Sequence, residues 1–308
     1  MRFAWTIALA VSLLPALTAR AQPRAVRTET LPLGKIHAWS MPRWSPDGRM
    51  VFYTSADFNG IWAYTVGGGS PGRVTADRGA GSGFSISDDG ARVAYRRMLP
   101  GALPGEVLQE AVVRDVAGGA PSVLATGASI TVPVFIRSDV VFSVGGQLQG
   151  VYPGDREAGP VTVLGIEDSK IALLRGGVKL LIDPLGNGNY LWPSLSPDAA
   201  RLVACESERG TFVASADGGY PVRIGRRDAP DWTRDGRWLI YMADDNDGRG
   251  KHATGIGYVS PDGKMHGILS FPARGGAMYP RVSPVADEIV CCTRQGEVLV
   301  ITYSEASR

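Results

Sequence analysis

The sequence predicts an all-β fold: a six-bladed β-propeller of four-stranded antiparallel blades, with a ring closed by an N-terminal strand. First, residues 41–69 read as strand, turn, strand, loop, strand and glycine-rich turn, and this pattern recurs along the chain. Second, strands such as Val51-Phe52-Tyr53 are continuously apolar, which is typical of strands covered on both faces. Third, 40 glycines and 21 prolines fit a fold with frequent turns. Because a sheet with two apolar faces is not stable alone, related sheets must stand on either side of it.

The first 21 residues are predicted to be a signal peptide. Arg2 supplies the positive end, residues 7–17 form a short apolar core, and Ala19-Arg20-Ala21 is a small-x-small site with cleavage after Ala21. The apolar core is shorter than the roughly 20 residues of a membrane span, and the alternative is an uncleaved anchor. No later segment is long and apolar enough to span a membrane. We therefore expect residues 22–308 to form the propeller domain of a periplasmic or secreted protein.

The charge of the chain argues against a nucleic-acid partner. The formal net charge is +2, and two of the positive charges belong to the predicted signal peptide. The remaining domain is close to neutral, whereas nucleic-acid binding requires a concentrated basic face.

The first repeat explains the strand pairing. Pro46 presets the first corner of a tight turn, Asp47 bonds its own backbone, and Gly48 accepts a positive φ. The flanking strands, residues 43–45 and 50–54, are therefore expected to pair. The second repeat has the same turn at residues 87–90 and a long loop over residues 98–109, which is either an insertion or a functional loop.

The third repeat is the least regular. Its first two strands are residues 132–135 and 139–144, but the turn between them is reduced to Arg137-Ser138-Asp139. Residues 161–164 and the hairpin 170–182 compete for the outer positions. The excess length of this region is about one hairpin, so we expect one long blade, with a degenerate seventh blade within residues 137–190 as the alternative.

The last repeats are regular, and the final one lacks a strand. Repeats four, five and six begin near Trp192, Trp232 and Tyr279. The sixth ends after its third strand, residues 297–303. An N-terminal strand, residues 26–33, has no turn partner of its own. Its addition to the last sheet would close the ring and cover an exposed edge.

These repeats resemble those of TolB-like periplasmic β-propeller proteins. Trp44-Ser45-Pro46-Asp47-Gly48 matches the Ser-Pro-Asp-Gly pattern of the family in full, and residues 195–198, 217–219 and 232–236 match it well. The resemblance covers nearly all of residues 22–308 and implies the propeller fold. Related propellers also serve in prolyl-oligopeptidase-type peptidases and polysaccharide lyases, so the fold does not determine the function. The N-terminal α/β domain of TolB has no expected counterpart in residues 22–35.

No catalytic set is apparent, so we expect a protein that is not an enzyme and has no cofactor and no metal site. His37, His252 and His266 are scattered. The acidic loop 243–248 lacks the bidentate glutamate of a calcium loop. No Gly-x-Ser-x-Gly motif is present. The three cysteines, Cys205, Cys291 and Cys292, are expected to be small buried hydrophobic residues.

Propellers bind ligands where the innermost strands begin, over the central channel. The expected binding residues at this channel face are Trp39, Met41, Arg43, Tyr190, Trp192, Asp228, Asp231, Tyr279 and Arg281. Aromatic residues and arginine are enriched at interface hot spots. We therefore expect an exported, non-enzymatic propeller that binds a protein or glycan partner in the cell envelope. The alternatives are that Trp192 and Tyr279 only pack between blades, and that the ionisable residues form a channel-sited hydrolase or lyase acting on a carbohydrate or peptide.

Overall fold

The structure is a computed structural model, and it describes residues 21–34, 38–100, 107–150, 161–246, 252–270 and 276–306. Residues 1–20 of the expected signal peptide and His37 lie outside the described residues. The one helical element in the described part of the chain is a short 3-10 turn, η1 (Ala80–Ser82). In this part of the chain no helix has the length and apolar character needed to cross a membrane.

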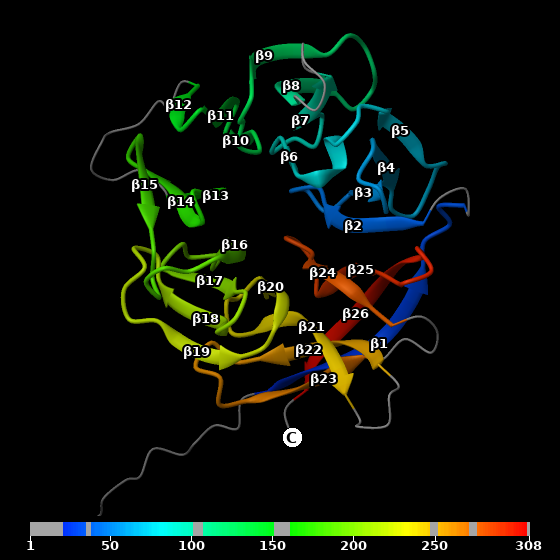
Figure 1. Cartoon of the computed structure of the whole chain (residues 1–308). Helices are drawn as coiled ribbons and strands as arrows, with labels where there is room; N and C mark the ends of the chain where they lie inside the picture. The colour runs from blue at the N-terminus through cyan, green and yellow to red at the C-terminus, as the bar shows by residue number, and fades with distance from the viewer. Residues whose placement is uncertain are drawn as a thin grey trace, which may run out of the picture.

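The described strands form seven antiparallel sheets that stand around a central axis, each one a propeller blade (Figure 1). Strands β2, β6, β10, β13, β16, β20 and β24 lie nearest the axis. Blades 1 and 2 comprise β2 (Trp39–Trp44), β3 (Met50–Ser55), β4 (Ile61–Thr65), β5 (Gly72–Thr75), β6 (Phe84–Ile86), β7 (Arg92–Pro100), β8 (Val107–Asp115) and β9 (Ser122–Gly127). Blades 3 and 4 comprise β10 (Val134–Ile136), β11 (Asp139–Val144), β12 (Gln147–Gln149), β13 (Thr162–Glu167), β14 (Lys170–Arg175) and β15 (Val178–Ile182).

The second half of the ring returns to four strands per blade. Blades 5 and 6 comprise β16 (Tyr190–Leu195), β17 (Arg201–Glu206), β18 (Gly210–Ser215), β19 (Val222–Gly225), β20 (Asp228–Trp232), β21 (Leu239–Asn246), β22 (His252–Val259) and β23 (His266–Ser270). Blade 7 has the order β24 (Met278–Val282), β25 (Glu288–Cys292), β26 (Val298–Ala306) and β1 (Gln22–Thr30).

The prediction of six four-stranded blades is wrong, because the irregular third repeat contains two blades. Strands β10, β11 and β12 form one three-stranded sheet, and β13, β14 and β15 form another. The turn between β13 and β14 consists of Asp168 and Ser169, both with positive φ, in place of a Ser-Pro-Asp-Gly turn. A blade without a fourth strand needs little more sequence than a hairpin, which is why one long blade was expected here.

Ring closure by an N-terminal strand is confirmed, with different bounds. Strand β1 pairs antiparallel with β26 along its length, from Gln22 opposite Ala306 to Thr30 opposite Leu299. The expected strand was residues 26–33, whereas β1 begins at Gln22 and ends at Thr30, with one further hydrogen bond from the Leu31 N–H to the Val298 carbonyl oxygen (2.8 Å). Two distant parts of the sequence therefore share the outer half of blade 7.

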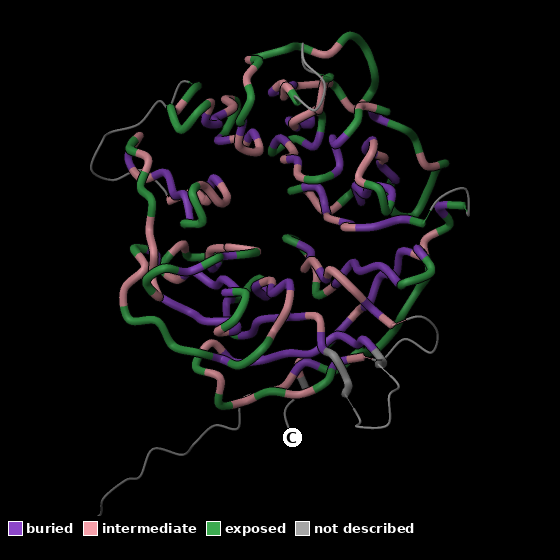
Figure 2. The backbone as a smooth tube through the Cα atoms, in the orientation of Figure 1, coloured by how far each residue is buried: buried purple, intermediate pink, exposed green. Residues whose placement is uncertain are grey.

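One apolar cluster lies at each of the seven junctions between neighbouring blades in the described structure. The second strands are the most buried parts, as in β3, where Val51, Phe52 and Tyr53 are fully buried. Figure 2 shows the same distribution, with buried backbone in the blades and exposed backbone at the outer edges and turns. Burial on both faces explains the continuous apolar runs of the sequence. The junction between blades 2 and 3 is the thinnest, with only Ala111, Ile130 and Phe142 in its buried cluster.

The Ser-x-Asp turns are held by one repeated hydrogen-bond pattern. In blade 1 the Ser45 hydroxyl donates to Asp47 Oδ1 (2.6 Å) and accepts from the Met50 backbone N–H (2.9 Å). The same oxygen of Asp47 accepts from the Arg49 N–H (3.0 Å). The hydrogen bond from Ser45 is the main reason that the pKa of Asp47 lies below its usual range. Equivalent bonds join Ser87 to Asp89 and Ser196 to Asp198, so the turn fixes the register of each hairpin.

Candidate functional site

Four of the innermost strands contain the same β-bulge. In each, a residue with positive φ precedes a proline: Met41-Pro42, Trp192-Pro193, Ala229-Pro230 and Tyr279-Pro280. These pairs oppose a single residue of the second strand, which shifts the strand register. A proline at a bulge leaves no ladder hydrogen bond unmade. Positive φ is costly for a residue with a side chain, by about 1–3 kcal/mol each, and such strain clusters at ligand and functional sites.

The residue after each of these prolines lies on an innermost strand, β2, β16, β20 or β24. These residues are Arg43, Ser194, Asp231 and Arg281. Arg43, Ser194 and Arg281 line a single hollow of about 450 Å³, together with residues 161–163 at the beginning of β13. The lining therefore comes from innermost strands of blades 1, 4, 5 and 7, on different sides of the ring (Figure 1). This hollow, called the channel site below, is the candidate functional site.

Two arginines and one carboxylate define the charge of the channel site. Arg281 Nη1 lies 3.5 Å from Asp231 Oδ1, and the other oxygen, Oδ2, accepts a hydrogen bond from the Val282 N–H at 2.8 Å. Arg43 Nη1 donates to the Phe84 carbonyl oxygen, and its guanidinium lies 4.3 Å from the centre of the Phe84 ring. These contacts connect blade 6 with blade 7 and blade 1 with blade 2, so the same side chains also hold neighbouring blades together.

The pKa values show how strongly this environment acts on the charges. Burial, and then the nearby positive charge of Arg281, lower the pKa of Arg43 to about 9, although Asp231 acts in the opposite direction. Burial raises the pKa of Asp231, while Arg281 and the Val282 N–H act to lower it. The two arginines and one aspartate therefore leave an excess of positive charge at the channel site, and burial disfavours the charge on Arg43.

Arg43 also has an unused donor. Its Nε atom is buried and has no hydrogen-bond partner in the described part of the structure. A buried donor without a partner costs about 1–3 kcal/mol. Such a group in a hollow is a candidate contact for a ligand.

Three of the expected aromatic or apolar site residues occupy the bulges. Met41, Trp192 and Tyr279 are each half-buried and carry the positive φ that precedes proline. Tyr279 packs against the apolar cluster between blades 7 and 1, as the packing alternative expected. The bulges, rather than a shared pocket, are what these residues have in common.

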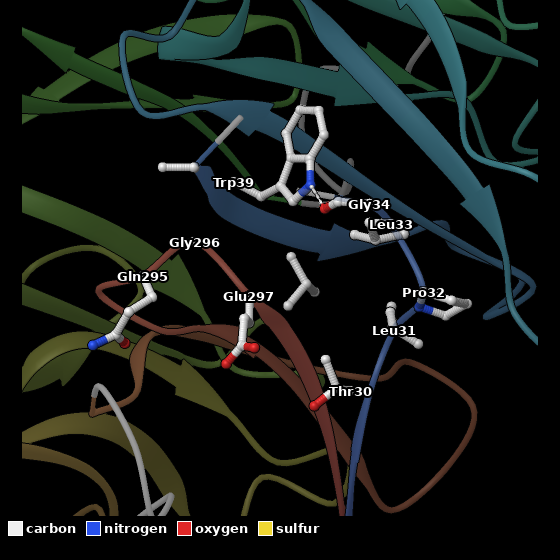
Figure 3. Close-up of a pocket in the computed structure, with 11 residues that line it drawn as sticks. Thr30, Leu31, Pro32, Leu33, Gly34, Trp39, Gln295, Gly296 and Glu297 are labelled. Carbon is white, nitrogen blue, oxygen red and sulfur yellow. Dashed lines mark hydrogen bonds between the residues drawn. The ribbon is translucent and has the colours of Figure 1, made fainter. Parts of the chain in front are cut away.

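Trp39 lies away from the channel site, at the seam between blades 1 and 7. It is buried and lines a separate hollow of about 510 Å³ between the segment after β1 and the turn before β26. Figure 3 shows the Trp39 indole N–H donating to the Gly34 carbonyl oxygen (3.2 Å), with Gln295 and Glu297 across the hollow. The prediction that Trp39 faces the same site as Arg43 is not supported by this placement.

Tyr190 and Asp228 are also separated from the channel site. Tyr190 is buried, and its hydroxyl donates to Asp183 Oδ1 (2.6 Å) and accepts from the Leu185 N–H (2.8 Å). Asp228 lines a third hollow, of about 500 Å³, with Arg226, Arg227 and His266. Of the ionisable set Arg43, Asp228, Asp231 and Arg281, only Asp228 is separated from the others in this way.

The channel site also contains residues that were not predicted from the sequence: Ser194, Thr162 and the aliphatic residues Val161, Val163 and Leu195. Ser194 could have been found, because it follows Pro193 just as Arg43 follows Pro42. No signal pointed to residues 161–163, since their blade was not recognised. In the described residues no group of three or more His, Cys, Asp or Glu side chains is placed to hold a metal ion. The three cysteines are free thiols and buried.

Comparison with known proteins identifies the fold. No protein-family model matches the chain, and neither does any curated protein. TolB from Acinetobacter baumannii is similar in structure, with a TM-score of 0.53 and 15% sequence identity over 79% of this chain and 56% of that one. The chain therefore spans little more than half the length of that TolB structure. The expected resemblance to TolB-like β-propellers is confirmed as a resemblance of fold.

Two other solved structures are similar to a comparable extent. Oligogalacturonate lyase from Vibrio parahaemolyticus gives a TM-score of 0.52 and 12% identity, over 87% of this chain and 78% of that one. A chain of the mitotic checkpoint complex gives 0.60 and 12% identity over 98% of both chains. Because proteins of such different kinds share the fold at low identity, these similarities describe architecture and not activity.

Proposed function

We propose that this chain is an exported, non-enzymatic TolB-like β-propeller that binds a protein partner at the channel site in the cell envelope. The observation that carries the proposal is the gathering of Arg43 and Arg281 around one hollow, with a buried donor of Arg43 left without a partner. The bulges support it, because strained residues surround this part of the channel. Export is supported by the signal-like residues 1–21, and it predicts a processed protein that begins at Gln22.

The contacts of Asp231 favour binding over catalysis. Both of its carboxylate oxygens already have partners, Arg281 and the Val282 N–H. A general base needs a lone pair within hydrogen-bond reach of the proton that it removes, and these contacts compete for the lone pairs of Asp231.

The test compares partner capture by the native protein and by channel variants. The purified domain is crosslinked to an envelope fraction of the native host, and captured proteins are identified by mass spectrometry. Arg281→Gln is expected to lose a defined partner that the native protein captures. Arg223→Gln is the matched control, because Arg223 is an exposed arginine on the outer strand β19. Equal capture by all three proteins would place binding elsewhere and contradict the proposal.

The alternative is a channel-sited hydrolase or lyase acting on a carbohydrate or peptide. It is favoured by the proximity of Arg281 and Asp231, which satisfies the requirement that catalytic groups reach one substrate. It predicts turnover of a polysaccharide or peptide by the purified domain, abolished in Asp231→Asn. Such turnover would replace the binding proposal.

A further inference from the structure

We infer that the channel site binds a carboxylate of a protein partner, held between Arg43 and Arg281 and presented by an acidic side chain on an extended segment. This inference rests on the proposed function and names the chemistry that the site selects. It is carried by three features of the channel site: its charge, its unused donor and its lining.

The first feature is the charge balance. Arg43 and Arg281 are the charged residues of the lining, and Asp231 beside them supplies one negative charge. One positive charge is therefore left without a counter-charge among the described groups of the site. A single carboxylate would neutralise it, whereas a second cation or a neutral ligand would leave the excess in place.

The second feature is the geometry of the Arg43 guanidinium. One of its edges is already used, because Nη1 donates to the Phe84 carbonyl oxygen and the Phe84 ring covers a face. The guanidinium is therefore fixed before a ligand arrives, while its buried Nε–H has no partner among the described residues. Guanidinium groups bind carboxylates through pairs of parallel N–H donors, and a pre-oriented guanidinium loses little freedom on binding.

The third feature is the lining, which favours a peptide over a glycan. Besides the arginines, the hollow is formed by two hydroxyl residues, Thr162 and Ser194, and by the aliphatic or proline residues Val161, Val163, Pro193 and Leu195. Aliphatic walls suit the methylene groups of an acidic side chain and of an apolar neighbour. A sugar ring would require more polar partners for its hydroxyl groups than this lining provides.

Removal of the Asp231 charge is expected to strengthen ligand binding, whereas most substitutions at a binding site weaken it. The Asp231 carboxylate holds Arg281 but also repels an incoming carboxylate. In Asp231→Asn the amide oxygen can still accept the Val282 N–H, while the competing negative charge is lost. Binding of an acidic ligand is therefore expected to become tighter in this variant, which a purely structural role of Asp231 would not produce.

The experiment titrates the purified domain with defined probes, followed by calorimetry or by NMR. The peptide acetyl-Leu-Glu-Leu-amide is compared with its glutamine counterpart, and an oligogalacturonate provides a carboxylate on a sugar. The native protein is expected to bind the glutamate peptide about 10-fold or more tightly than the glutamine peptide, since a hydrogen bond to a charged group contributes about 1.5–3 kcal/mol. Arg281→Gln should lose this preference, Arg281→Lys should keep part of it, and Arg223→Gln should keep all of it.

The outcomes separate this inference from the proposed function. Binding of both peptides with equal affinity, or weaker binding by Asp231→Asn, would overturn the carboxylate inference. Tighter binding of the oligogalacturonate than of the glutamate peptide would overturn the choice of a protein partner. If neither probe binds but the envelope partner is still captured in an Arg281-dependent manner, the proposed function stands and the carboxylate inference fails. Because Arg281 and Asp231 also connect two blades, their variants are compared only where their unfolding matches that of the native protein.

Discussion

Truncation of Leu173 would test whether β13, β14 and β15 form a true blade of the ring. Leu173 lies on the middle strand β14 with 1% of its surface exposed, and it packs in the cluster that joins blades 4 and 5. Its cross-strand partner on the outer strand β15 is Leu180, which is 36% exposed. The two leucines are matched in chemistry and differ in burial.

The expected cost differs accordingly. Replacing a fully buried leucine by alanine costs about 3–4 kcal/mol, because apolar contacts are lost and a cavity remains. The same change at Leu180 should cost less, about 1–2 kcal/mol, since this residue is only partly buried. Leu173→Met conserves volume and should cost less than about 1.5 kcal/mol, which separates loss of packing from general intolerance of the site.

The free energy of unfolding would be measured by guanidinium chloride denaturation at 25 °C, followed by tryptophan fluorescence and circular dichroism. Similar small losses, below about 1 kcal/mol, for both alanine variants would refute the reasoning. In that case the hairpin would lie on the surface of the ring without forming an interior layer, and the arrangement of seven blades would be wrong.

Three further predictions concern ionisation, packing and thiols. Burial alone would raise the pKa of Glu206, but hydrogen bonds from the Arg209 backbone N–H and other donors outweigh burial and lower the pKa to about 2. The carboxylate therefore stabilises the fold fully above about pH 4.5, and this stabilisation is lost as the pH falls towards 2. The melting temperature of Glu206→Gln should therefore lie below that of the native protein at pH 7 and converge with it near pH 2, and a gap independent of pH would contradict this. Gly257→Ala would place a Cβ 2.4 Å from Tyr241 Cζ and should destabilise the fold by about 1–3 kcal/mol in urea denaturation, whereas Gly72→Ala, with open space around it, should not. The three buried cysteines should react with a thiol reagent only as fast as the protein opens, because burial keeps the reagent away and also raises the pKa of each thiol. Fast reaction of the native protein would show that they are accessible.

The blades that the sequence located are those whose turns have local signals. Pro46, Asp47 and Gly48 each dictate a backbone conformation, so the first hairpin and its repeats could be predicted from short-range chemistry. In blade 4 the corresponding turn uses Asp168 and Ser169 with positive φ, which neither residue type requires. Strands β13, β14 and β15 form a separate blade because they pack against the neighbouring blades. Local sequence patterns do not contain this information.

The candidate site was predicted in part for a related reason. Of the residues expected at the channel, Arg43 and Arg281 line the channel site and Asp231 contacts Arg281, whereas Trp39, Tyr190 and Asp228 lie elsewhere. The direction of side chains in a strand alternates with period two, but each X-Pro bulge adds a residue and resets the alternation. Residues on either side of the bulge therefore face different surroundings, although they belong to one strand.

The pairing of β1 with β26 has a consequence for how the molecule is made. Strand β1 precedes its partner β26 in the chain by six whole blades, so it is synthesised long before the strand that it pairs with. Every other blade can complete itself from nearby residues, but the last must wait for contacts between distant parts of the chain, which slows folding. In the meantime β1 is a strand without a sheet, and at high concentration it could complete the ring of another copy instead of its own.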